Sequence, residues 1–266
     1  MKPVIVYTVH KAGSSFLNRL IRQTCRRLKI EHCSENDDRY HERIFNSSWK
    51  TIIEDSKDIG CFGPVRGSTR LPIFPDNLND YSVVLHLRDP RDVLTSMYFS
   101  FSYSHTIRPG RFEATEQQRE NWRNQGIDKF VLDAAPRVCA TYTKLCSQLL
   151  VNPNVSLLLY EDMVLNYGSW LSGFLSAFEH MNVPARKVGY ILLSQNARRK
   201  KIHRDLFDRH KDDFQVDRED IYSHKRKVVP GDHKDKLAES TVDQLNEIFA
   251  DYFDVIRPLT QKSAAG

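Results

Sequence analysis

Residues 4–16 constrain the fold more than any other stretch of this 266-residue chain. They begin with the β-branched run Val4-Ile5-Val6, which predicts a buried strand. A tight turn at Lys11-Ala12-Gly13 follows, and apolar residues at helical spacing between Phe16 and Leu28 predict a helix after it. Free N–H groups at the start of such a helix attract an anion, as do the turn lysine and the hydroxyls of Ser14 and Ser15. The stretch therefore predicts a cradle for a phosphate or sulfate group.

A second junction of the same kind lies near the middle of the sequence. Residues 83–87 form an apolar, β-branched run that predicts a buried strand, and Pro90 and Asp92 suit the first turn of a following helix. Arg88 then stands at the strand end, and Ser96 lies about two turns into the helix. An arginine grips phosphate with a planar fork of donors, so we expect a second anion site here.

The remaining pattern alternates strands with helices. Residues 59–63 and 155–160 predict two more strands, and apolar spacing predicts helices near 130–149, 170–178 and 242–253. This alternation indicates an α/β fold, with a central, mainly parallel sheet flanked by helices. We expect one domain over residues 1–258 and a disordered tail over 259–266. The charge-rich segment 198–213 predicts a solvated face or a loop, and the polar segments 31–58 and 99–127 are expected to form a binding pocket.

Composition narrows the classes of partner. The net charge of +5 suits an anionic ligand but is too small and too dispersed to indicate nucleic acid. No apolar run approaches the roughly 20 residues that span a bilayer, and the N-terminus passes directly into a strand. The five cysteines are scattered and form no C-x-x-C pair, so neither a zinc site nor a disulfide framework is predicted. We expect a cytoplasmic protein that binds neither nucleic acid nor membranes.

Two strings resemble the signatures of sulfotransferases that use 3′-phosphoadenosine 5′-phosphosulfate (PAPS). Lys11-Ala12-Gly13-Ser14-Ser15-Phe16 resembles their 5′-phosphosulfate loop. The string from Arg88 to Ser96 resembles their 3′-phosphate motif, Arg-[Asp/Asn]-Pro-x-Asp-x-x-x-Ser. The nucleotide triphosphatase loop fits less well, because its lysine follows the second glycine whereas Lys11 precedes Gly13. The resemblance implies a P-loop-like sulfotransferase fold, PAPS as co-substrate and no metal.

A third string is similar to the loop that closes over the 3′-phosphate in this family, Arg-Lys-Gly-x-x-Gly-Asp-Trp. Four residues agree with it: Arg226, Lys227, Gly231 and Asp232. Val228 replaces a glycine and His233 replaces the tryptophan. The resemblance implies that Arg226 and Lys227 contact the 3′-phosphate.

Two aromatic residues are candidates for the adenine pocket. Tyr160, at the head of the string Tyr160-Glu161-Asp162 after a predicted strand, resembles the family tyrosine near adenine; the alternative is a core residue at a strand end. Phe16 stands where the family often has tryptophan, so it either stacks on adenine or belongs to the helix core.

The general base is the part that the resemblance does not supply. Cytosolic sulfotransferases carry a histidine in a Lys-Thr-His-Leu-Pro-like loop, and the nearest string here, residues 68–72, has Arg70 at that position. Arginine stays protonated and cannot act as a base. The candidates are His10, His105, a carboxylate, or no dedicated base.

These observations predict a sulfotransferase that moves a sulfuryl group from PAPS to a hydroxyl or amine of a small-molecule or glycan acceptor. Lys11 is then the catalytic cation at the leaving group. Two alternatives stay open. One is a P-loop kinase-like phosphotransferase, and the other is a protein that binds a phosphorylated nucleotide without chemistry.

Overall fold

The computed structural model describes residues 2–34, 49–56, 58–66, 74–104, 116–182, 187–188, 191–192, 194–214, 219–222 and 227–264. The chain divides into two compact units that interleave along the sequence. The first comprises Met1–Leu87 and Gln148–Asp213, and the second comprises Arg88–Ser147 and Phe214–Gly266. All the strands of the described residues belong to the first unit.

The first unit is built on a five-stranded parallel sheet in the order β2-β3-β1-β4-β5. Its strands are β1 (Val4–Thr8), β2 (Glu31–Cys33), β3 (Ile59–Arg66), β4 (Ser82–Leu87) and β5 (Val155–Leu159). Every residue of β1 is buried, as expected for a central strand covered on both faces. In the register, Thr8 of β1 lies beside His86 of β4. The predicted α/β class with a parallel sheet is confirmed.

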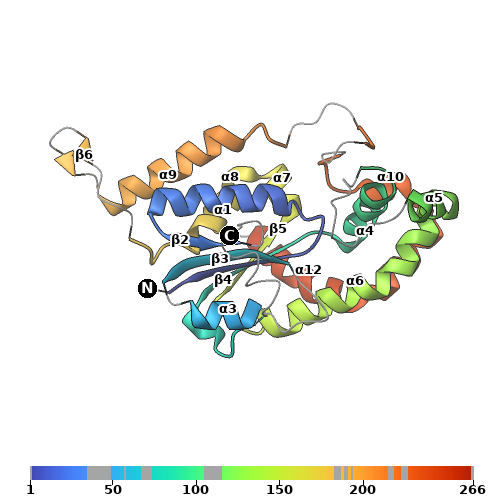
Figure 1. The fold of residues 1–266 in the computed structure, drawn as a ribbon, viewed down its shortest axis with the longest axis horizontal. Helices are drawn as coiled ribbons and strands as arrows, with labels where there is room; N and C mark the ends of the chain where they lie inside the picture. Colours follow the sequence, from blue (N-terminus) through green and yellow to red (C-terminus); the bar gives the residue numbers. More distant parts are fainter. Residues whose placement is uncertain are drawn as a thin grey trace. The chain divides into compact units, whose positions relative to one another are not determined.

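Helices cover both faces of this sheet (Figure 1). They are α1 (Ser14–Leu28), α3 (Trp49–Asp55), α7 (Tyr160–Leu165), α8 (Tyr167–Ser176) and α9 (Gln195–His210), with a 3₁₀ turn, η1 (Leu78–Asp80). On one face α1 packs against β3 and β2, α8 packs against β5, and α9 lies on α1 and α8. Figure 1 shows α3 on the opposite face. Two short strands, β6 (Lys187–Val188) and β7 (Ile191–Leu192), form an antiparallel pair.

The sequence predicts either a solvated face or a loop over segment 198–213. It is not a loop, because most of it belongs to α9. The Ser194 hydroxyl caps this helix by accepting the Ala197 N–H, and Leu206 is fully buried. Charged residues occupy the remaining surface of the helix, so the expectation of a solvated face holds.

The second unit is helical. It contains α4 (Pro90–Phe99), a π-helical turn η2 (Ser100–Ser104), α5 (Glu116–Gln125), α10 (Asp232–Lys236), α11 (Glu239–Ile248), α12 (Ala250–Ala264) and all but the last residues of α6 (Ile127–Leu149). Rings gather in its core: Tyr142 meets Tyr252 and Phe249 edge-on, with centroids 4.9 and 6.0 Å away. The helix expected near 242–253 is two helices, which meet at Phe249. Because α12 continues to Ala264, most of the expected tail is helical.

Pro136 lies inside α6, which runs through it as a single helix. Within the described ranges, no helix has both the length and the apolar character that a bilayer crossing requires.

Candidate active site

The turn between β1 and α1 has the backbone conformation of an anion cradle. Lys11 has φ 64° and Gly13 has φ 71°, so both lie in the left-handed region. For lysine this conformation is uncommon and strained, and such strain collects at functional sites. Gly13 is the N-cap residue of α1 and has no side chain to accept the first N–H groups of the helix. The N-terminus of α1 therefore lacks a side-chain cap, and the positive end of its dipole favours an anion there.

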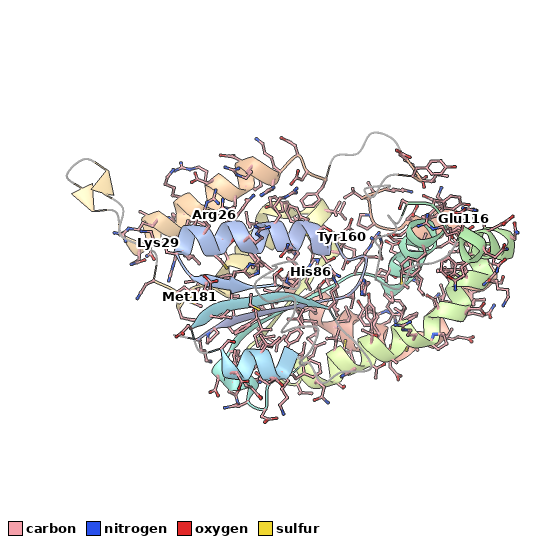
Figure 2. All side chains as sticks on the ribbon, in the orientation of Figure 1. Arg26, Lys29, His86, Glu116, Tyr160 and Met181 are labelled. Carbon is pink, nitrogen blue, oxygen red and sulfur yellow. The ribbon has the colours of Figure 1, made fainter. Side chains whose placement is uncertain are left out.

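Gly13 is also required by its neighbours. A Cβ built at this position would lie 3.1 Å from Cε of Met163 and 3.3 Å from Cε2 of Tyr160. The Tyr160 ring, which is 5% exposed, therefore packs directly against the turn. Figure 2 labels Tyr160 beside the N-terminal end of α1. The structure thus places Tyr160 against the turn, although the sequence assigned the two to the site from separate motifs.

His86 supports the turn from inside the sheet, a role that the sequence did not predict. It is fully buried on β4, and its Nε2 lies 3.0 Å from the Ala12 carbonyl oxygen. Burial lowers the pKa of His86 to about 4, against a smaller opposing effect of that hydrogen bond. The ring is therefore neutral at pH 7, and the Nε2–H donates to Ala12 because a carbonyl only accepts. The only sign in the sequence is a histidine within the apolar run 83–87.

Phe16 has the surroundings of a core residue. It is 9% exposed and meets the rings of Tyr167 and His210 edge-on, at centroid distances of 6.1 and 5.3 Å. The Arg19 guanidinium lies 5.5 Å from the centroid of the same ring. These contacts fit the alternative in which Phe16 is a core residue of the helix.

The other predicted residues of the turn differ in exposure. Ala12 is buried, Lys11, Gly13 and Ser14 are half-buried, and Ser15 and His10 are exposed. His105 and the Arg70 loop lie outside the described residues, as does Arg226.

In the second unit, a buried carboxylate organises the predicted 3′-phosphate elements. The Asp92 side chain has no exposed surface and accepts hydrogen bonds from the backbone N–H groups of Gly231 and His233, at 2.7 and 3.0 Å. It also accepts from Nδ1 of His233 at 2.7 Å. Nη2 of Arg88 lies 3.7 Å from the same carboxylate. Asp92 therefore holds the segment 231–233 against the start of α4.

The electrostatics of Asp92 follow from these contacts. Burial alone would raise its pKa, but the hydrogen bonds from His233 and Gly231 and the charge of Arg88 outweigh burial and lower the pKa to about 2. Asp92 is therefore a carboxylate at all physiological pH values. His233, which stands where the resembled motif has tryptophan, donates its Nδ1–H to this carboxylate.

Arg88, Lys227 and Ser96 also belong to the second unit. The Arg88 backbone is fixed by the Tyr142 hydroxyl, which donates to its carbonyl at 2.6 Å, and its side chain is 5% exposed. Nζ of Lys227 lies 2.8 Å from Asp235 and 3.1 Å from Asp232, and the hydrogen bond with Asp235 raises its pKa. Ser96 is half-buried on α4.

Comparison with known proteins then decides the family. A sequence model of the sulfotransferase domain matches residues 1–257. The chain belongs to the sulfotransferase domain family. A search of curated protein sequences returned no match.

One solved structure agrees with this assignment at the level of the fold. The structure of a mouse sulfotransferase complexed with PAP aligns with a TM-score of 0.51 and 14% identity. The alignment covers 100% of this chain and 89% of the mouse protein. Retinol dehydratase, in complex with retinol and PAP, aligns over 95% and 81% of the two chains, with a TM-score of 0.44 and 13% identity. The strand order also fits a ligand site at the carboxyl end of β1. The connection from β1 leads towards the β2 edge of the sheet, and the connection from β3 leads back past β1 towards the β5 edge.

Proposed function

We propose that this sulfotransferase moves the sulfuryl group of PAPS to a hydroxyl or amine of a small-molecule or glycan acceptor. The observation that carries the proposal is the turn at residues 11–13. Lys11 and Gly13, both in the left-handed conformation, lead there into the uncapped N-terminus of α1. Tyr160 packs against the same turn. Sulfotransferase family membership supports sulfuryl transfer as the reaction.

The 5′-phosphosulfate is assigned to this turn. N–H groups of residues 13–16 would bind its oxygens, and Lys11 would lie at the bridging oxygen between phosphorus and sulfur. Negative charge grows on that oxygen as the S–O bond breaks, so a fixed cation there stabilises the transition state more than the ground state. The Ala12 carbonyl oxygen accepts a hydrogen bond from the buried His86, which fixes the backbone of the turn from inside the sheet.

The 3′-phosphate is assigned to Arg88, Ser96 and Lys227, with Arg226 as a further contact predicted from the sequence. The Arg88 guanidinium supplies paired donors and Ser96 supplies a hydroxyl. Asp92 supports this assignment by holding the 231–233 segment, which follows Lys227 closely in the chain.

The acceptor proton needs a base, and His10 is the described candidate. It is exposed and directly precedes Lys11 at the end of β1, where a neutral imidazole would be open to an acceptor hydroxyl. His105, a carboxylate, or the absence of a dedicated base are the competing assignments. The five cysteines are all free thiols, which supports a reducing compartment such as the cytoplasm.

Two measurements test the proposal. PAP should raise the melting temperature at concentrations where ATP with Mg²⁺ has a much smaller effect, because the chain carries separate 5′ and 3′ phosphate motifs. Labelled PAPS, incubated with a panel of phenols, alcohols, amines and glycans, should then yield a labelled acceptor. Equal or greater stabilisation by ATP with Mg²⁺ would favour the kinase-like alternative. Tight PAP binding without transfer to any acceptor class would favour the binding protein.

A further inference from the structure

The first unit contains a cavity that the proposed reaction does not use. It has a volume of about 760 Å³ and is enclosed by the C-terminal half of α1, the C-terminal half of α8 and the N-terminal half of α9. Thr24, which lines it, lies ten residues into α1 and so about 15 Å along the helix axis from the anion turn. Figure 2 labels Arg26 and Lys29 at this end of α1 and Tyr160 near the other. The cavity is therefore a partly open cleft separate from the turn, and its volume falls within the range typical of small-molecule sites.

The inner wall of the cavity is apolar. Five side chains without polar atoms line it: Leu28, Leu175, Phe178, Ala197 and Ile202. The Thr24 hydroxyl does not interrupt this wall, because it is inaccessible to solvent and so lies behind the surface that a ligand would meet. The inner wall therefore suits the apolar part of a ligand.

The rim of the cavity is cationic. Arg199, Lys200 and Arg204 line it from α9, and Glu179 is the only carboxylate among the lining residues. Arg199 is held in place, because Nη2 donates to the backbone carbonyl of Glu179. The exposed side chains of Lys200 and Arg204 form no hydrogen bond or ion pair with another described residue. The cavity thus gives a role to Arg199, Lys200 and Arg204, which the sulfotransferase reaction leaves unexplained.

An apolar body with one ionised head group matches both parts of the cavity. We propose that it binds an amphipathic organic anion, with the apolar body against Leu175 and Phe178 and the acidic head beside Lys200 and Arg204. Fatty carboxylates and alkyl sulfates share this chemistry. The inference stands apart from the assignment of PAPS, since none of the lining residues belongs to either phosphate motif.

The test is a fluorescence titration with 8-anilinonaphthalene-1-sulfonate, which is itself an amphipathic anion. Saturable one-site binding is expected. Dodecanoate and decyl sulfate should both displace the probe, and their relative potency separates the two head groups. The uncharged dodecanol should displace it far less, because it cannot meet the cationic rim. Displacement by dodecanol as strong as by dodecanoate would overturn the assignment of an anion.

Variants locate the site. Lys200→Glu together with Arg204→Glu should weaken dodecanoate binding about fivefold or more, the scale set by losing two partly exposed charge contacts. Arg209→Glu is the control, since it reverses one charge on α9 at an exposed residue that does not line the cavity, and it should leave binding unchanged. Leu175→Trp should weaken binding by occupying the apolar wall against which the ligand body is placed. If that variant does not fold, Ala197→Leu, a smaller change that narrows the cavity from α9, replaces it and should also weaken binding. Unchanged affinity in the charge-reversed double variant, or an equal loss in the Arg209 control, would overturn the proposal.

Discussion

Replacing Asp92 by asparagine gives a sharp test of how the 3′-phosphate elements are held. The carboxylate accepts three N–H donors within 3.0 Å and lies 3.7 Å from the Arg88 guanidinium, with none of its surface exposed. Asparagine has nearly the same shape, but only one of its two polar atoms accepts. At least one N–H of the 231–233 segment then faces an NH₂ group, and the buried Arg88 charge loses its counter-charge.

The expected cost follows from these contacts. A hydrogen bond to a charged group contributes about 1.5–3 kcal/mol. Breaking a buried ion pair by removing one partner costs about 3–5 kcal/mol, so we expect the Asp92→Asn variant to lose an amount of that order. In a protein of this size, such a loss lowers the melting temperature by roughly 10 °C. Because the total free energy of unfolding is usually about 5–15 kcal/mol, the variant should still fold at 25 °C.

Urea denaturation gives the stability, and calorimetric titration with PAP and with AMP gives the binding. AMP lacks the 3′-phosphate, so the variant should lose about tenfold or more in affinity for PAP, the effect of about 1.4 kcal/mol, and much less for AMP. Asp133→Asn is the control, because it removes an exposed carboxylate 3.0 Å from Lys129 and should cost less than about 1 kcal/mol.

Acid provides an independent check on the same carboxylate. The folded-state pKa of Asp92 is lowered to about 2, below its ordinary value, so its contribution is complete above about pH 4. That contribution is lost as the pH falls from 4 towards 2, and the stability difference between the two proteins should shrink over that range. A variant with unchanged stability and an unchanged preference for PAP over AMP would show that Asp92 does not hold the loop.

Four further predictions concern the phosphate turn, the histidine that supports it and the start of α4. Arg88→Ala should weaken PAP binding by about 1.5–3 kcal/mol and AMP binding by much less, as calorimetry would show; equal losses would place Arg88 away from the 3′-phosphate. Lys11→Ala should lower kcat by about 10²–10³-fold with a far smaller loss of PAP affinity, and steady-state kinetics with equal losses in both would refute a leaving-group role. If His10 is the base, kcat/KM should rise through a pKa near neutrality, and His10→Asn should remove that limb. His86 has a folded-state pKa lowered to about 4, so stability should fall by about 2 kcal/mol from pH 7 to pH 5, as the unfolded state takes up the proton first. In His86→Gln this acid limb should be missing from urea denaturation curves, and a limb identical to the parent's would assign it elsewhere.

The parts of the fold that the sequence predicted well are those with local causes. The apolar runs at 4–8 and 83–87 specify buried strands without reference to anything distant, and Gly13 marks the following turn by its own conformation. Segment 198–213 shows the opposite case. Its charges suggested a solvated face or a loop, yet capping by Ser194 and burial of Leu206 make most of it a helix. The cap is local, but the packing of α9 on α1 and α8 is not contained in a local pattern.

The candidate site divides in the same way. The motif strings predict Lys11, Arg88 and Lys227 as site residues, because their spacing is a property of the chain. The residues that support the turn and the 231–233 segment could not be identified from motif spacing. His86 acts on Ala12, 74 residues away, and Asp92 binds the backbone of His233, 141 residues away. A histidine in an apolar strand and an aspartate in a first helical turn have ordinary local explanations, so only the fold reveals what they hold.

The left-handed conformation of Lys11 has a consequence for engineering. For a residue with a side chain this conformation costs roughly 1–2 kcal/mol, and only glycine adopts it without strain. A glycine at position 11 would therefore make the unliganded protein more stable, while it would remove the cation that the reaction is proposed to need. Selection for thermal stability alone would favour loss of the lysine, whereas selection for turnover would retain a less stable turn. Stability and activity thus make opposing demands on one residue, and a stabilised enzyme has to gain its free energy elsewhere in the chain.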